Sequence, residues 1–171
     1  MKTTLILIAM FFAIAQSQYL MEGTYIFTCK GNGKNLDIEG GVPNNGANVI
    51  LFQDNGQQGN QRFVVDYVAG QYVTLVAEGS GKAITVGGNK VGDTYTQQEI
   101  KMSGATDAQL FKPYFNKDGT LSLINKNGLA ITCPDTLTTP SNNKFAVQGD
   151  RKCTDIEKFT YKVMNPPVPT L

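Results

Sequence analysis

Four residues between positions 37 and 61 have side chains that together suit the binding of a polyhydroxylated ring. Asp37 provides a carboxylate, Phe52 an aromatic face, and Asn60 and Gln61 adjacent amides. An ionised carboxylate accepts hydrogen bonds from neighbouring hydroxyl groups, and an amide both donates and accepts. The apolar C–H face of a pyranose stacks on an aromatic ring. The four residues therefore predict a non-catalytic sugar site, provided that the fold brings them together.

Each of these residues also has a purely structural interpretation. Phe52 ends the apolar run VILF and would suit a core, and Asp37 shortly precedes a Gly-Gly turn that it would cap. Asn60 and Gln61 would tie strands together. In an alternating strand Leu36 and Ile38 face the core, so Asp37 between them faces outward. The elements that hold these residues decide between the two interpretations.

A repeated pattern defines those elements. Phe63, Phe111 and Phe159 recur every 48 residues, each two positions after a glutamine or glutamate. The segments GKNLDI, GKAITV and GLAITC recur at spacings of 48 and 47 residues. Two landmarks that share one period indicate internal repeats. Each repeat has four short β-rich runs separated by turns that contain Gly and Asn, and no useful length shows helical periodicity.

The repeats predict an all-β fold, namely a β-trefoil of three four-stranded repeats of about 48 residues. One four-stranded unit cannot bury its own apolar face, whereas three units around an axis close a barrel. We place the repeats at about 22–66, 67–114 and 115–163. A three-bladed propeller is the competing architecture, and it is disfavoured because propellers typically have four or more blades.

The first repeat resembles a ricin B-type lectin repeat. Its Tyr-x-Phe opening, GKNLDI, NGA and NQRF follow one another in the family's order, although the family usually has tryptophan where Phe63 stands. The resemblance covers all three repeats and is weakest in the third. It implies that Asp37, Phe52 and Asn60 bind galactose or N-acetylgalactosamine and that Gln61 supports Asp37. Ile50 replaces a polar contact residue of many relatives, which leaves the sugar open.

The later repeats lack the carboxylate, the aromatic ring and the asparagine at the corresponding positions. By alignment these positions are Thr85, Ile100, Ala108 and Gln109 in the second repeat, and Thr132, roughly Gln148, Ile156 and Glu157 in the third. We therefore predict a single sugar site, in the first repeat, and no enzymatic activity.

The chain ends predict secretion. Residues 1–17 contain Lys2, an apolar run over 5–15 and then small residues, as in a signal peptide; eleven apolar residues are too few for a membrane span. The β-trefoil domain then covers residues 18–164, and residues 165–171 form a proline-rich tail. We expect no membrane insertion and a secreted, extracellular protein.

Composition excludes several other functions. With 15 basic and 14 acidic residues scattered along the chain, the footprint of a nucleic-acid binder is absent. Histidine is absent too, which argues against His-based catalysis and most zinc sites, so we expect no metal and no cofactor. Because Cys133 and Cys153 share a repeat, we predict that they form a disulfide. Cys29 is then either buried or available to a second chain in a homo-oligomer.

Two other functions remain to be tested. The Pro-bearing loops EGGVPNNGAN and CPDTLTTPSNNK suit an inhibitor that enters a protease cleft, a role that the β-trefoil scaffold also supports. A glycosidase would need two carboxylates at a defined separation. Asp54, Asp66 and Glu39 are present, but they show no recognisable spacing. The leading prediction is a lectin whose partners are glycans that contain galactose or N-acetylgalactosamine.

Overall fold

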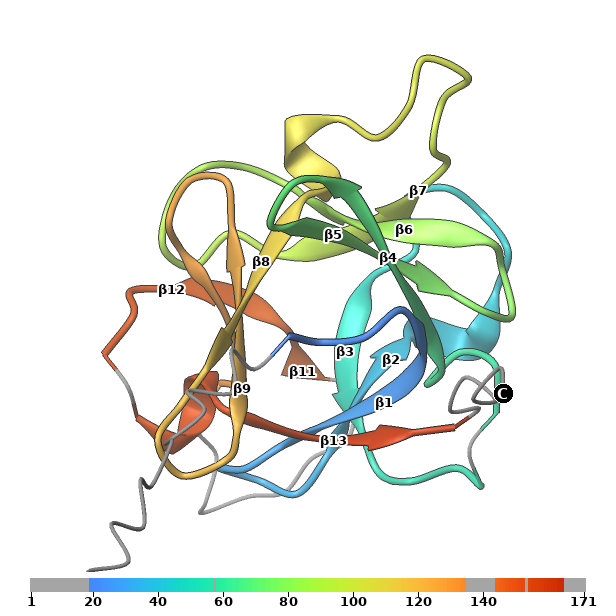
Figure 1. Ribbon diagram of the computed structural model, residues 1–171. Coiled ribbons are helices and arrows are strands. Elements are labelled where there is room, and N and C mark those ends of the chain that lie inside the picture. Colours follow the sequence, from blue (N-terminus) through green and yellow to red (C-terminus); the bar gives the residue numbers. More distant parts are fainter. Residues whose placement is uncertain (1–18, 57, 135–143, 153, 165–171) are drawn as a thin grey trace, which may run out of the picture.

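The computed structural model describes residues 19–56, 58–134, 144–152 and 154–164. The predicted signal peptide, most of the loop CPDTLTTPSNNK, Cys153 and the proline-rich tail lie outside these residues. The described chain is all-β, as predicted (Figure 1). Its strands are β1 (Gly23–Cys29), β2 (Asn35–Ile38), β3 (Val49–Phe52), β4 (Phe63–Ala69), β5 (Tyr72–Ala77), β6 (Lys82–Val86), β7 (Tyr95–Gln98), β8 (Phe111–Phe115), β9 (Leu121–Asn125), β10 (Ala130–Thr132), β11 (Lys144–Phe145), β12 (Val147–Gly149) and β13 (Phe159–Val163).

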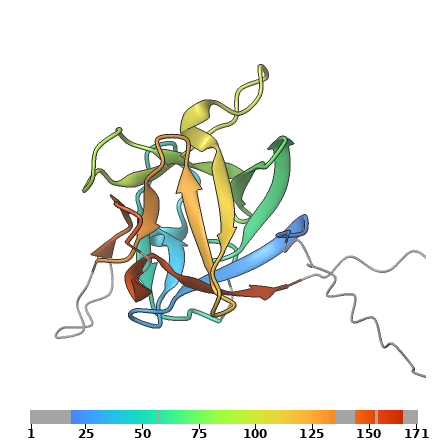
Figure 2. The same ribbon diagram turned by 60° about the vertical axis from the view of Figure 1, so that its left-hand side comes forward.

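Helical structure in this part of the chain is limited to three short 3₁₀ turns. These are η1 (Glu39–Gly41), η2 (Asp107–Gln109) and η3 (Asp155–Glu157). Within the described residues, no helix has the length and hydrophobicity needed to cross a bilayer. The loop over residues 99–106 projects away from the strands in both ribbon views (Figures 1 and 2).

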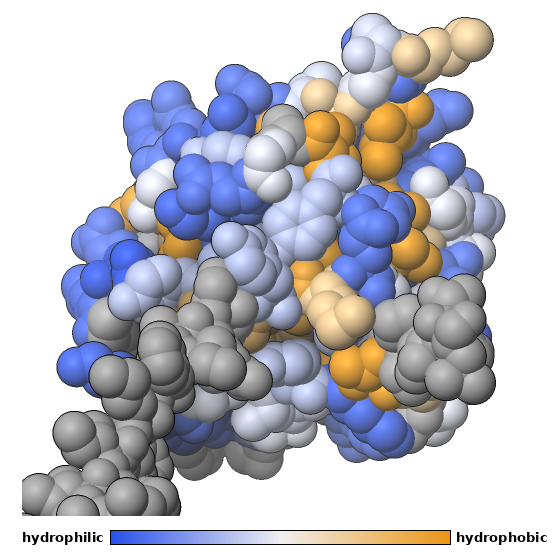
Figure 3. All heavy atoms as spheres, in the orientation of Figure 1, coloured by the Kyte–Doolittle hydropathy of each residue, from blue (hydrophilic) through white to orange (hydrophobic). Residues whose placement is uncertain are grey.

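Six strands close a barrel. Antiparallel pairing runs from β1 through β4, β5, β8, β9 and β13 and returns to β1 (Figure 1). Closure of this kind removes free strand edges. The recurring residues Phe63, Phe111 and Phe159 each begin a barrel strand and are fully buried with Phe27. These aromatic residues therefore form the centre of the core, while hydrophilic residues predominate on much of the face shown in Figure 3.

Three two-stranded units extend from the barrel. The pairs β2–β3, β6–β7 and β10–β12 are joined to β1, β5 and β9 respectively. Neighbouring units are linked to one another by the bridge Asn48↔Thr96, by the bridge Thr94↔Val147 and by the pairing of β11 with β3. The three units therefore form a ring, and β11 reaches from the last part of the chain to the strand that ends at Phe52.

The predicted pairing of Cys133 with Cys153 is wrong. Cys133 is bonded to Cys29, which lies 104 positions earlier in the sequence, and their Cα atoms are 6.5 Å apart. The segment from η3 into β13 brings the two cysteines together, because the Ile156 carbonyl accepts from the Cys133 N–H and the Lys158 carbonyl from the Lys30 N–H. Barrel closure determines the partner here, whereas the prediction relied on closeness in sequence.

Replacing Cys29 and Cys133 by serine should lower the free energy of unfolding by about 5 kcal/mol, since the cross-link closes a loop of roughly 100 residues in the unfolded chain. Denaturant unfolding under oxidising conditions measures this loss. Cys153→Ser serves as the control and should leave the linkage intact. Peptide mapping that found Cys133 joined to Cys153 would contradict the assignment.

Candidate functional site

The register of β2 and β3 places Asp37 and Phe52 on the same face. Leu36 pairs with Leu51 and Ile38 with Val49, and all four side chains are buried in the core. Asp37 pairs with Ile50, so both point to the opposite face. Phe52 follows Ile50 by two positions on that face and is half-buried, outside the core cluster. The core interpretation of Phe52 is therefore wrong.

Two amides from the segment before β4 hold the Asp37 carboxylate. Asn60 Nδ2 donates to both carboxylate oxygens at 3.0 Å, and Gln61 Nε2 donates to Oδ2 at 2.7 Å. These contacts leave Asp37 only 2% exposed, although it faces away from the core. Asp37 is thus held by the amides of the neighbouring segment rather than acting as a simple turn cap.

Gln61 has a purely supporting position. It is fully buried, and its Oε1 accepts from Asn35 Nδ2 at 3.0 Å and from the Asn55 N–H at 3.3 Å. Its Nε2 also donates to the Gln53 carbonyl at 2.8 Å. Asn55 Nδ2 in turn donates to Asn60 Oδ1 at 3.0 Å. This network fixes the orientation of both amides and hence of the carboxylate between them.

Burial changes the acidity of Asp37. Desolvation raises its pKa to about 6, and the hydrogen bonds from Gln61 and Asn60 oppose that rise. Removing a carboxylate from water disfavours its charged form, whereas amide donors favour it. At neutral pH the ionised carboxylate accepts hydrogen bonds only, and below pH 6 the protonated form becomes the major one.

The face that carries Asp37 and Phe52 opens into a pocket of about 340 Å³. Its lining residues are Asp37, Glu39, Gly40, Ile50, Phe52, Asn55 and Asn60. Three of the four predicted site residues therefore share one pocket, and Gln61 lies behind it. The sequence analysis did not select Glu39 and Asn55 for this site. Glu39 follows Asp37 by two positions, and Asn55 belongs to the turn after Phe52, so alternation and turn chemistry were the available signals.

The corresponding positions elsewhere differ from those that the 48-residue spacing predicted. Thr85 pairs with Thr96, and Thr132 with Val147, as Asp37 pairs with Ile50. The counterparts of Phe52 are therefore Gln98 and Gly149, instead of Ile100 and Gln148. Compared with the segment from Asp37 to Ile50, the segment from Thr85 to Thr96 is two residues shorter and that from Thr132 to Val147 is two residues longer. These length differences shift the alignment. Neither counterpart is aromatic, and a Cβ on Gly149 would clash with the Thr132 hydroxyl group.

Solved structures identify the architecture. The designed 3-fold symmetric protein ThreeFoil is similar with a TM-score of 0.76 and 25% identity, over 84% of this chain and 100% of its own. The fold is a β-trefoil. The trefoil is also similar to the Rhizoctonia solani agglutinin, with a TM-score of 0.72 and 18% identity over 86% and 99% of the two chains. The Polyporus squamosus lectin, solved with the epitope Neu5Acα2-6Galβ1-4GlcNAc, is similar with a TM-score of 0.66 and 14% identity, over 85% of this chain and 50% of its own.

Larger proteins contain the same fold as one part. The trefoil covers 31% of an exo-β-1,3-galactanase from Clostridium thermocellum and 18% of a mosquitocidal holotoxin, each with a TM-score of 0.73. No family model and no curated protein matches the sequence. Membership of the ricin B-type family therefore stays a prediction.

The Asp37 carboxyl should titrate with a midpoint near pH 6. Because its folded pKa exceeds the ordinary value of 3.8, the native state binds the proton more tightly than the unfolded state. The free energy of unfolding should therefore decrease as the pH rises from about 4 to about 6, and Asp37→Asn should remove this contribution. Denaturant unfolding across the window and carboxyl ¹³C NMR measure both effects.

Asp118 is the internal control for this titration. The Thr120 hydroxyl, with Lys158 and Lys30, lowers the pKa of Asp118 below its ordinary value. Its resonance should shift only at much lower pH than that of Asp37. An Asp37 midpoint near pH 4 would contradict the proposed effect of burial.

Proposed function

We propose that this protein is a secreted, non-catalytic lectin of the ricin B type that binds galactose or N-acetylgalactosamine on glycans. The observation that carries the proposal is the shared pocket of Asp37, Phe52 and Asn60, in which two amides already orient the carboxylate. A pre-oriented polar group lowers the ordering cost of binding a flexible, hydrated ligand.

Each group in the pocket has a role toward a pyranose. The exposed part of the Phe52 ring takes the apolar C–H face of the sugar. The Asp37 carboxylate has about one acceptor site left beside its three amide contacts, and the Asn60 carbonyl has a second lone pair besides the one that Asn55 uses, so the two residues can each accept from one sugar hydroxyl group. Glu39, fixed by a 2.7 Å hydrogen bond from Asn48 Nδ2, adds an acceptor at the pocket edge.

The structural neighbours support the choice of ligand class. The epitope solved with the Polyporus squamosus lectin contains a galactose unit, and the Rhizoctonia solani protein is an agglutinin. We extend galactose recognition to this chain on the basis of the pocket chemistry. Ile50 in the pocket wall favours a ligand with an apolar group at that position.

The remaining parts of the proposal follow from the sequence. Residues 1–17 would be removed as a signal peptide, and the mature domain would consist of three four-stranded repeats. The 48-residue period and the ring of three two-stranded units support that division. One site with a dissociation constant of about 1 mM gives roughly −4 kcal/mol, so binding to cell surfaces would benefit from a homo-oligomer.

Hydrolysis is the competing activity, because Asp37 and Glu39 line one pocket and a galactanase shares the fold. Glycosidases use two carboxyl groups on either side of the scissile bond. We assign a binding role instead, since two amides fix the Asp37 carboxylate and occupy three of its acceptor sites. Release of reducing sugar from galactans by the wild-type protein would reverse this assignment.

Phe52→Ala should weaken binding of methyl β-galactoside at least tenfold, because it removes the stacking surface and leaves the hydrogen-bonding network in place. Phe52→Trp should retain binding, since it restores an aromatic face. Isothermal calorimetry measures the affinities, and thermal unfolding verifies the fold of each variant. Gln98→Ala, at the matching position of β7, is the control and should bind like the wild type. Equal affinity of Phe52→Ala and wild type would refute the site.

Galactoside binding should also weaken as the pH falls through about 6. The Asp37 carboxyl, whose pKa is about 6, then becomes protonated and loses acceptor strength toward the sugar hydroxyls. The expected loss is progressive between pH 7 and pH 5. Calorimetric titrations at these pH values test it, and an affinity that is independent of pH would show that the ionised carboxylate is not a ligand.

A further inference from the structure

Three turns of the trefoil occupy corresponding places, but one has a different residue at its contact point. The turns between β1 and β2, β5 and β6, and β9 and β10 contain Gly31, Gly79 and Asn127, spaced 48 residues apart. At the first two turns the glycine packs against the segment that precedes a barrel strand. The third turn has an asparagine instead of the glycine, and it is one residue shorter, because Ala130 pairs with Ile124 six positions away whereas the other two turns join partners seven positions apart.

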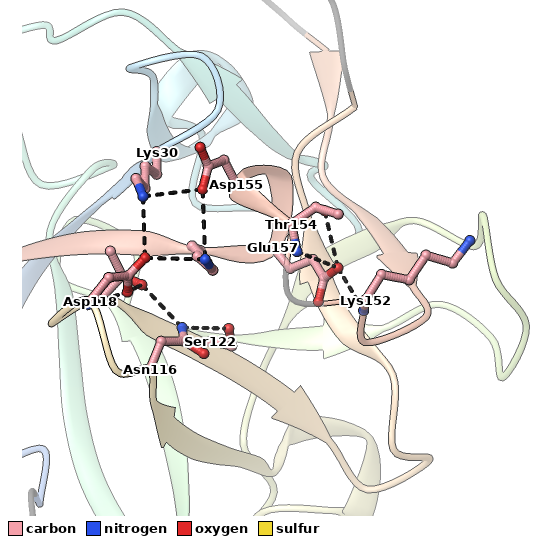
Figure 4. Close-up of polar contacts among 10 residues, drawn as sticks. Lys30, Asn116, Asp118, Ser122, Lys152, Thr154, Asp155 and Glu157 are labelled. Atoms are coloured by element: carbon pink, nitrogen blue, oxygen red, sulfur yellow. Dashed lines mark hydrogen bonds and ion pairs between the residues drawn. The ribbon is translucent and has the colours of Figure 1, made fainter.

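The two glycine turns make close backbone contacts. A Cβ on Gly79 would lie 3.1 Å from the Gly59 carbonyl carbon, and the Gly79 N–H donates to the Gly59 carbonyl at 3.0 Å. The cavity at that junction is only about 10 Å³. A Cβ on Gly31 would lie 3.1 Å from Ile156 Cγ2. At the Gly31 junction, the adjacent Lys30 also forms an ion pair with Asp155 at 3.1 Å (Figure 4).

The Asn127 junction is open. Within the described chain, Lys126 and Asn127 make no backbone hydrogen bond to the segment before β8, whereas Lys30 and Gly79 make such bonds at the other two junctions. The resulting space, called here the Asn127 groove, has a volume of about 470 Å³, within the range of small-molecule sites. Its lining residues are Tyr72, Val86, Gly88, Asp107, Ala108, Lys126 and Asn127.

The Asn127 groove combines polar groups of both kinds with an aromatic ring. Lys126 Nζ lies 4.4 Å from the centre of the Tyr72 ring and 3.6 Å from Asp107 Oδ1. Lys126 therefore links the two walls and supplies donors, while the Asp107 carboxylate supplies acceptors. Asn127 is exposed, and its amide provides both a donor and an acceptor. Val86 and Ala108 add apolar surface.

We propose that the Asn127 groove is a second ligand site, which takes a neutral saccharide unit. The Lys126–Asp107 pair carries no net charge, so Asp107 would repel an anionic ligand and Lys126 would repel a cationic one. A ring with neighbouring hydroxyl groups satisfies the donors and the acceptors together. The choice of ligand class rests on the proposed lectin function, but the groove shares no residue with the Asp37 pocket.

A second site would change how the protein binds a surface. Two weak sites on one rigid domain make the second binding event intramolecular when two sugar units lie at a matching distance. The trefoil would then gain avidity as a monomer, without a partner chain.

NMR titration of the ¹⁵N-labelled domain with methyl β-galactoside and with N-acetylgalactosamine tests the proposal. We expect chemical-shift changes in residues 86–88, 107–108 and 126–127 that persist in Phe52→Ala. The variant Asn127→Gly, which removes an amide from the groove lining, should weaken binding at the groove at least tenfold. Lys126→Ala should also weaken it, and Asn89→Gly on an exposed loop is the matched control that should not.

The outcomes separate this proposal from the lectin function. Changes confined to the residues of the Asp37 pocket would overturn the second site and leave the first intact. Changes confined to the groove would support the second site and refute the first. Binding at the groove that neither Asn127→Gly nor Lys126→Ala weakens would overturn the proposal. If neither sugar causes any chemical-shift change, both the second site and the proposed lectin function are contradicted.

Discussion

The buried polar side chain two positions before each recurring phenylalanine is the constraint on which the trefoil depends. Gln61, Gln109 and Glu157 are all buried, and a buried polar group costs free energy unless it is hydrogen-bonded. Gln109 bonds the Thr106 N–H and the carbonyls of β7 and its following residue. Glu157 accepts from the Thr154 and Lys152 N–H groups, as Figure 4 shows. Each side chain thereby fixes the chain just before it enters the barrel.

In the first part of the chain, the hydrogen bonds that satisfy this buried side chain also shape the Asp37 pocket. Gln61 satisfies its donors with the Asp37 carboxylate and the Gln53 carbonyl, so the architectural amide also orients the acid. At the matching place Gln109 contacts the Thr85 hydroxyl at 3.3 Å. Desolvation of Asp37 raises its pKa, and the amides limit that rise. The acid therefore remains ionised at neutral pH while it is nearly enclosed.

Departures from the threefold pattern occur at the loops and turns, away from the barrel interior. The connections between paired strands differ in length by two residues, which moves Gln98 and Gly149 into the place of Phe52. One turn has Asn127 where two others have glycine, and a groove opens there. Substitutions in the core would disturb close packing throughout the barrel, whereas these surface changes alter individual pockets at little cost to it.

The sequence by itself determined the all-β class, the core phenylalanines and three of the residues that line the Asp37 pocket, because strand alternation and a strict period can be read from residue types. Pairings that connect distant parts of the chain were decided by the tertiary structure alone. Cys29 meets Cys133 because the barrel closes, and Glu39 and Asn55 join Asp37 because turn geometry directs them. Periodicity fixes which face a residue occupies; only closure of the barrel fixes which distant residues share that face.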